Sequence, residues 1–189
     1  PANYPDGAPG TGATIVEALS GHKVGVLNVM GRVFMQPLDC PFRAAERELA
    51  RLKLVPPVII VDMHAEATSE KVAMGWHLDG RVSAVLGTHT HIQTADEHVL
   101  PKGTAYISDL GMTGPYDSII GRNKDAVLKK LRTGMPARFD VAEGDVRACA
   151  EWTADQMRRI GLQNVRLEET PGHPCVYGEW LGAPGAPTI

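Results

Sequence analysis

Two short, largely apolar segments, each followed by histidine, constrain the fold of this chain more than any other feature. The first segment, Val58–Val61, precedes His64, and the second, Val82–Leu86, precedes His89 and His91. Short apolar runs of this kind are typical of strands covered on both faces of a sheet. A helix-forming segment lies between them, and alternating strands and helices indicate an α/β fold. The sequence therefore predicts that all three histidines follow the ends of strands in one sheet.

The rest of the chain continues this alternation. Residues 1–12 are rich in Pro and Gly and are predicted to form a loop. A helix is predicted to begin at Thr68–Lys71, where Thr68 or Ser69 can cap it and Glu70 lies in the first turn. The other predicted helices are Phe42–Lys53, Asp125–Arg132 and Val146–Ile160, and the other predicted strands are Ala13–Leu19, Lys23–Val29, Arg81–Leu86, Thr104–Ser108, Ala137–Ala142, Val165–Leu167 and Val176–Tyr177.

Composition limits the class of protein and its partners. The 189 residues are 43% apolar and 22% charged, as in soluble globular proteins, and the net charge is −3. No block of basic residues indicates an extended nucleic-acid groove, and no apolar stretch is long enough to span a membrane. The three cysteines are far apart in the sequence and form no metal-binding or disulfide pattern, so we expect reduced thiols and a cytoplasmic location.

The three histidines predict a metal site. Ligands in open α/β sheets gather beyond the carboxyl ends of the strands, where His64, His89 and His91 are expected to lie. On an extended segment, residues two apart project to the same side, which would point His89 and His91 in one direction; in a tight loop, both side chains can reach neighbouring ions. Because imidazole binds zinc, manganese and iron well, these side chains are candidate metal ligands.

Several carboxylates lie near these histidines in the sequence. Asp62 and Glu66 flank His64, and Asp96 follows the histidine pair. Each could accept a hydrogen bond from a metal-binding imidazole and so fix its tautomer, or could be an ordinary carboxylate at a strand end or helix start. The Gly-rich segment 109–115 is either a lid that faces a substrate or a plain turn.

Longer motifs resemble a known family. The segments Asp62–Lys71 and Asp79–Asp96, with Pro101–Tyr106, Gly111–Asp117 and the opening Pro1–Pro5, resemble the YmdB-like family of metallophosphoesterases over about residues 1–143. The resemblance implies a calcineurin-like, layered αββα sandwich. It also implies a site with two metal ions, usually iron or manganese with zinc as an alternative, and hydrolysis of small phosphodiesters such as 2′,3′-cyclic nucleotides.

The resemblance assigns the metal ligands His64, His89 and His91 to this chain. The family also uses an Asp, a Glu-Asn pair and an Asn-His pair that precede the segment matching Pro1, and this chain has no counterpart of them. We therefore expect the C-terminal portion of a metallophosphoesterase domain, without the N-terminal part of the fold. A homo-oligomer, or another chain that completes the site, remains open.

The last part of the chain resembles a different family. Asp145–Ile189, notably Ala150-Glu151-Trp152 and Gly172-His173-Pro174, resembles the N-terminal segment of di-zinc dipeptidases. The predicted division is thus 1–144 and a helix-strand tail at 145–189. Three functions stay open: a metal-dependent phosphodiesterase, a truncated or fused polypeptide that acts as a binding or structural module, and a peptidase-related fragment.

Overall fold

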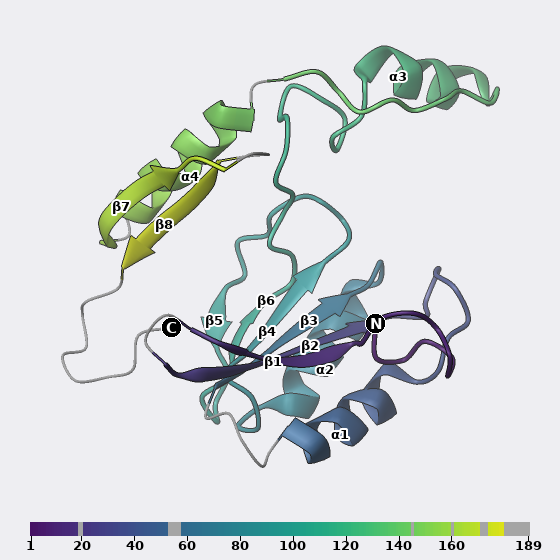
Figure 1. Cartoon of the computed structure of the whole chain (residues 1–189). Coiled ribbons are helices and arrows are strands. Elements are labelled where there is room, and N and C mark those ends of the chain that lie inside the picture. Colours follow the sequence, from purple (N-terminus) through teal and green to yellow (C-terminus); the bar gives the residue numbers. More distant parts are fainter. Residues whose placement is uncertain (19–20, 53–57, 145, 160, 171–173, 180–189) are drawn as a thin grey trace. The chain divides into compact units, whose positions relative to one another are not determined.

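The computed structural model describes residues 1–18, 21–52, 58–144, 146–159, 161–170 and 174–179 (Figure 1). The chain forms two compact units, residues 1–111 and residues 112–188. The predicted boundary at residue 144 stays a prediction. Within the described residues, no helix is both long enough and apolar enough to cross a lipid bilayer.

The first unit is built on a six-stranded sheet with the order β1-β2-β3-β4-β6-β5. The four central strands, β2, β3, β4 and β6, pair in parallel. The edge strand β1 pairs antiparallel with β2, and the edge strand β5 pairs antiparallel with β6. The strands are β1 (Ala13–Glu17), β2 (Lys23–Met30), β3 (Val58–His64), β4 (Ala84–Thr88), β5 (His98–Val99) and β6 (Ala105–Ile107). This parallel core confirms the expected α/β class.

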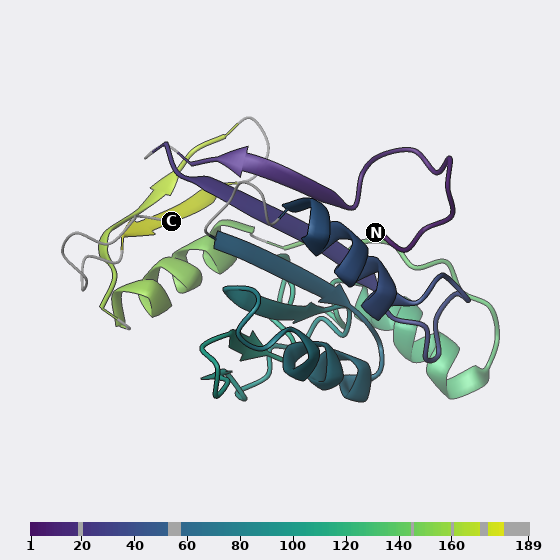
Figure 2. The same ribbon diagram turned by 90° about the horizontal axis from the view of Figure 1, so that it is seen from below.

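Two helices cover one face of this sheet. Helix α1 (Pro41–Leu52) lies between β2 and β3 in the chain, and α2 (Thr68–Leu78) lies between β3 and β4. Figure 2 shows both helices on the same side of the strands. Side chains that point toward the helices are fully buried, and each contributes about 1.5–3 kcal/mol through the hydrophobic effect. They include Leu27, Val29, Val61, Met63 and Val85.

Strand register brings polar residues together on the other face of the sheet. Asn28 of β2 pairs with Asp62 of β3, and His64 of β3 pairs with Thr88 of β4. All four side chains are half-buried, in alternation with the fully buried residues of each strand. Because the strands are parallel, their carboxyl ends align, so these residues gather at one end of the sheet.

Most predicted elements of the first unit are confirmed, with three corrections. Ala67 is the N-cap of α2 and makes no side-chain cap hydrogen bond, so capping by Thr68 or Ser69 was wrong. Strand β4 begins at Ala84 rather than at residue 81. Strand β5 was not predicted, because two exposed residues are too few to show a periodic pattern.

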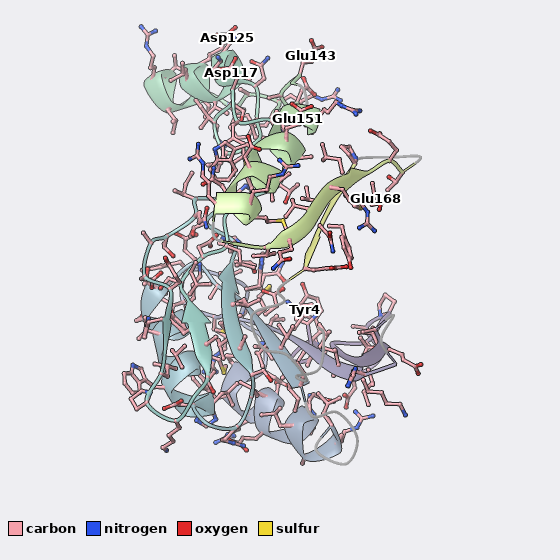
Figure 3. All side chains as sticks on the ribbon, turned by 90° about the vertical axis from the view of Figure 1, so that its left-hand side faces the viewer. Tyr4, Asp117, Asp125, Glu143, Glu151 and Glu168 are labelled. Atoms are coloured by element: carbon pink, nitrogen blue, oxygen red, sulfur yellow. The ribbon has the colours of Figure 1, made fainter. Side chains whose placement is uncertain are left out.

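The second unit contains α3 (Lys124–Thr133), α4 (Val146–Arg159) and the antiparallel strands β7 (Gln163–Glu168) and β8 (Cys175–Glu179), against which α4 packs. Figure 3 shows Asp125 of α3, Glu151 of α4 and Glu168 of β7 among the exposed acidic side chains of this unit.

The prediction of a strand at Ala137–Ala142 was wrong. Val141 forms only an isolated bridge with Arg122 and is 68% exposed, because no strand among the described residues offers it a longer ladder.

Candidate metal site

The ends of β3 and β4 bring two of the predicted histidines into contact. His64 is the last residue of β3, and His89 follows directly after Thr88, the last residue of β4. The two imidazole rings meet edge to face with centroids 4.8 Å apart. Nε2 of His64 lies 3.1 Å from Nδ1 of His89. The structure therefore places this pair where the strand ends predicted it.

The distance between these two nitrogens is close to that between two ligands of one cation. Two unprotonated imidazole nitrogens that face each other need a proton or a positive ion between them. Zinc–nitrogen bonds of about 2.0–2.1 Å at the tetrahedral angle place two ligand nitrogens of one ion roughly 3.3–3.4 Å apart. The observed 3.1 Å is slightly shorter, so a small separation of the rings brings His64 and His89 to two neighbouring positions around one metal ion.

A chain of hydrogen bonds fixes the tautomer of His64. Asn28 Nδ2 donates to Asp62 Oδ2, and Thr88 Oγ1 donates to Asp62 Oδ1, both at 2.7 Å. Because the hydroxyl proton of Thr88 is used in this way, its oxygen accepts from Nδ1–H of His64 at 3.0 Å. Nε2 of His64, the nitrogen nearest to His89, is then unprotonated, and the other ring N–H is held by an acceptor, as is usual for metal-binding imidazoles.

The environment of His64 also favours its neutral form. Burial lowers the pKa of His64 below its usual value, and the neighbouring His89 lowers it further, whereas Asp62 acts in the opposite direction. Metal ions bind neutral imidazole and compete with protons for it. His64 is therefore suited to metal binding near neutral pH.

Glu66 contacts the second histidine of the pair. Its Oε2 lies 3.1 Å from Nε2 of His89, so the carboxylate can accept the proton on that nitrogen. Nδ1 of His89 is then free of its proton and faces His64. Glu66, which was predicted as a possible acceptor for an imidazole near His64, thus contacts His89 instead.

His91 does not join the pair in this structure. Within the described residues, no group of three or more His, Cys, Asp or Glu side chains is arranged to hold a metal ion. Of the two backbone conformations considered for this segment, the structure has the tight loop rather than the extended one, and the role of His91 stays a prediction. Both residues have positive φ angles, 104° for His89 and 68° for His91, so the chain turns sharply at each of them.

Asp96 lies in a different network. Its Oδ1 accepts hydrogen bonds from the Ser108 amide at 3.1 Å and from Thr94 Oγ1 at 2.6 Å, and its Oδ2 accepts one from Ser108 Oγ at 2.5 Å. These contacts tie the segment after β4 to the end of β6. Among the described hydrogen bonds of the Asp96 carboxylate, none reaches the three histidines.

Sequence reasoning missed Asn28 and Thr88. Their role depends on which residues of adjacent strands stand opposite one another, and that register is not visible in a single strand. The threonine does lie within Gly87-Thr88-His89, but nothing in that run distinguishes a hydroxyl that orients an imidazole from a plain strand residue.

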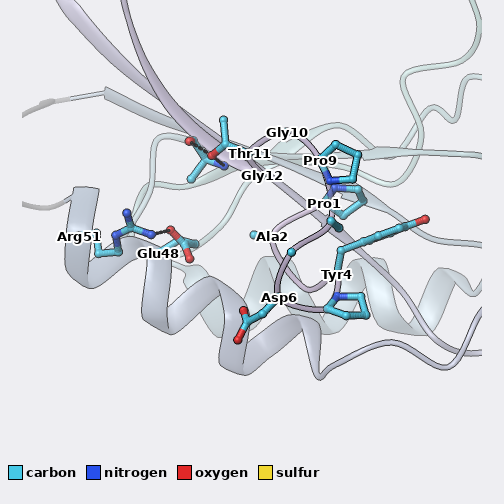
Figure 4. Close-up of a pocket in the computed structure, with 14 residues that line it drawn as sticks. Pro1, Ala2, Tyr4, Asp6, Pro9, Gly10, Thr11, Gly12, Glu48 and Arg51 are labelled. Atoms are coloured by element: carbon cyan, nitrogen blue, oxygen red, sulfur yellow. Dashed lines mark hydrogen bonds and ion pairs between the residues drawn. The ribbon is translucent and has the colours of Figure 1, made fainter.

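A cavity in the first unit lies away from this chemistry. It has a volume of about 560 Å³ and is lined mainly by the loop of residues 1–13, together with Glu48 and Arg51 (Figure 4). Arg51 pairs with Glu48 at 3.0 Å, so these two charges largely neutralise each other. The cavity contains none of the predicted site residues, and we place the candidate site at the histidines instead.

Comparisons with known proteins identify the family of this chain. The family model described as YmdB-like protein matches residues 1–159. A 2′,3′-cyclic-nucleotide 2′-phosphodiesterase of Bacillus subtilis (strain 168) is 56% identical over 144 residues, which cover 76% of this chain and 54% of that protein. The chain therefore spans about half the length of this curated relative.

Two crystal structures are also similar. A hypothetical protein from Thermus thermophilus is 41% identical with a TM-score of 0.72, over 94% of this chain and 66% of that one. A novel phosphatase from Mycoplasma pneumoniae is 35% identical with a TM-score of 0.67, over 76% of this chain and 52% of that one. The expected calcineurin-like fold class is confirmed by this phosphatase neighbour. The family match extends past residue 143 and includes α4, which lies in the segment predicted to be a peptidase-like tail. The chain belongs to the YmdB-like protein family.

Proposed function

We propose that this chain supplies part of the active site of a metal-dependent phosphodiesterase that hydrolyses small phosphodiesters such as 2′,3′-cyclic nucleotides. The observation that carries the proposal is the 3.1 Å approach of His64 Nε2 to His89 Nδ1 at the end of the sheet. The 56% identity with a 2′,3′-cyclic-nucleotide 2′-phosphodiesterase supports the substrate class.

We assign the metal-binding role to His64, His89 and His91. The first two use the ring nitrogens that face each other, and His91 lies in the same turn as His89. Two ions would be held in the complete site, with iron or manganese as the first choice and zinc as the alternative. When bound, such ions supply Lewis-acid chemistry that offsets the negative charge developing on the phosphoryl group.

Electrostatics support a role for cations. The candidate site contains the carboxylates of Asp62 and Glu66 beside the histidine pair, and the chain has a net charge of −3. An anionic phosphodiester would be repelled by these groups in the absence of positive ions. Bound metal ions reverse the local charge and make the same site attractive to the substrate.

We further propose a cytoplasmic protein that acts on small substrates. Among the cysteines whose side chains the structure describes, Cys40 and Cys175 are free thiols, in line with a reducing compartment. A homo-oligomer is compatible with this proposal and would be detected by light scattering.

A second candidate function is a binding or structural module without catalysis. One observation favours it: no group of three metal-binding side chains is assembled among the described residues. In that case the histidine pair would hold a single ion weakly or none.

Metal binding and hydrolysis distinguish the two functions. Calorimetric titration of the chain with Mn²⁺ or Co²⁺, followed by hydrolysis of bis-p-nitrophenyl phosphate and 2′,3′-cyclic AMP, should show binding and turnover that H64A and H89A both abolish. H77Q is the matched control, because His77 pairs with Glu46 and lies outside the site. Metal binding without turnover would favour the module, and binding unaffected by H64A would contradict the site.

A further inference from the structure

A buried ion pair joins α2 to the segment that follows β6. Lys71 Nζ lies 2.8 Å from Asp109 Oδ2, and the two side chains are only 3% and 1% exposed. Removing two charges from water is costly, and such pairs are seldom justified by stability alone. Neither residue belongs to the hydrophobic core or to the hydrogen-bond network of His64. The pair therefore calls for another explanation.

Asp109 holds the residue between the two histidines of the turn. Its Oδ2 accepts hydrogen bonds from the Thr90 amide at 3.1 Å and from Thr90 Oγ1 at 2.7 Å. Lys71 Nζ also donates to Thr90 Oγ1 at 3.4 Å. Thr90 thus has both its amide and its hydroxyl fixed by one buried carboxylate.

The turn that Asp109 holds is strained. His89 and His91 have φ angles of 104° and 68°, a region that side chains other than glycine rarely adopt. Strained backbone of this kind persists only where the surrounding structure enforces it, and it concentrates at functional sites. Hydrogen bonds to the middle residue of the turn are well placed to enforce both angles.

The charge of Asp109 strengthens this hold. Burial raises the pKa of Asp109, but the hydrogen bonds from Lys71, Thr90 and Gly111 outweigh burial and leave the pKa below its usual value. The carboxylate is therefore ionised, and hydrogen bonds to an ionised acceptor are roughly twice as strong as neutral ones. Lys71 supplies the counter-charge that makes an ionised group tolerable at this depth.

We propose that Asp109, neutralised by Lys71, is a positioning residue that holds the turn at His89–His91 so that the His89 ring faces His64. This inference rests on the proposed metal site and adds to it a residue that touches neither metal nor substrate. The segment 109–115 was predicted to be either a lid that faces a substrate or a plain turn. At Asp109 the lid is disfavoured, because this residue is buried and anchors the histidine turn.

Asp79 offers a matched control. It is also buried, with 6% exposure, and it accepts hydrogen bonds from the backbone amides of Lys102 and Thr104. It follows α2 and precedes β4, so it lies at the opposite end of the strands from the histidines. Loss of its charge should lower stability without reaching the metal site.

The test compares Co²⁺ affinity, measured by calorimetry, in the wild-type chain, D109N and D79N, with H64A as the background. We expect D109N to bind Co²⁺ about 10- to 100-fold more weakly than wild type, the usual cost of losing a group that orients a ligand. D79N should keep wild-type affinity even if its melting temperature falls. A double variant, K71M/D109L, removes both charges together and should restore stability but not affinity.

Each outcome of this test either supports or overturns the positioning role of Asp109. Wild-type affinity in D109N, or in K71M/D109L if D109N does not fold, would overturn the positioning role. If D109N and D79N lose Co²⁺ affinity equally, Asp109 only stabilises the fold in general, and this result would also overturn its positioning role. If the wild-type chain shows no Co²⁺ binding that H64A removes, the proposed metal site fails first, and the two failures are thereby distinguished.

Discussion

The two histidines that face each other are held by different physical means. His64 is the last residue of a regular parallel strand, and its ring is oriented by Thr88 and Asp62 from the same sheet. His89 lies in a turn with positive φ, and a buried ion pair from outside the sheet holds its neighbour Thr90. The comparison teaches that a site can combine a ligand placed by the sheet ladder with a ligand placed by tertiary contacts.

The largest effect should come from breaking the ion pair that supports the turn. The variant K71M leaves the Asp109 carboxylate buried at 1% exposure without its counter-charge. Loss of one partner of a buried pair costs about 3–5 kcal/mol, so the free energy of unfolding should fall by that amount. Urea denaturation followed by circular dichroism measures it. A loss no larger than that of a surface lysine variant such as K129M would show that the pair is not needed.

A smaller effect should come from removing the carboxylate that supports the His64 ring. In D62A the hydroxyl of Thr88 and the amide of Asn28 both lose their acceptor, and the tautomer of His64 is no longer fixed. We expect Co²⁺ affinity, measured by calorimetry, to fall about 10- to 100-fold.

E66Q sharpens the comparison between the two histidines. The Glu66 side chain is 48% exposed, and the hydrogen bond that it makes to His89 competes with water. The loss of Co²⁺ affinity in E66Q should therefore be smaller than in D62A. The opposite order would mean that His89 depends on its carboxylate more than His64 depends on the sheet network.

Glycine substitutions separate the strained turn from the regular strand. H91G relieves a positive φ of 68° and should raise the free energy of unfolding of the metal-free chain by up to about 1 kcal/mol. H64G places glycine at the last residue of a regular strand and should lower this free energy by up to about 0.5–1 kcal/mol. Thermal unfolding in a metal chelator compares them, and equal signs for the two variants would contradict the assignment of strain to the turn.

The smallest effect belongs to an exposed pair outside the site. The hydrogen bonds from Arg81 lower the pKa of Glu46 to about 2 from its usual 4.5. Because the folded-state pKa is lowered, this contribution to stability is present above about pH 4.5 and is lost as the pH falls toward about 2. E46Q should flatten the dependence of stability on pH in that window only slightly, since Glu46 is half exposed. An unchanged pH profile would show that the pair contributes nothing.

The sequence predicted what depends on local pattern. Apolar runs and their spacing located β3 and the helices α1 and α2, and the position of His64 and His89 after strand ends predicted their contact. The support of His64 by Thr88 and Asn28 could not be predicted, because it depends on strand register.

The rest of the site escaped prediction for a different reason. The spacing of His89 and His91 suited either an extended segment or a tight loop, and tertiary contacts, which the local pattern does not show, impose the positive φ angles of the turn. Lys71 reads in the sequence as an ordinary residue in the first turn of a helix. Its burial beside Asp109 follows from the packing of segments that are 38 residues apart in the chain.

The most direct test of a shared cation at the His64–His89 pair is nitrogen NMR of ¹⁵N-histidine-labelled chain during titration with Zn²⁺. Nε2 of His64 and Nδ1 of His89 should shift together, at the same metal-to-protein ratio, while their other ring nitrogens keep their protons. If the two nitrogens respond at different ratios, or if only one of them responds, the two histidines do not hold one ion and the account is wrong.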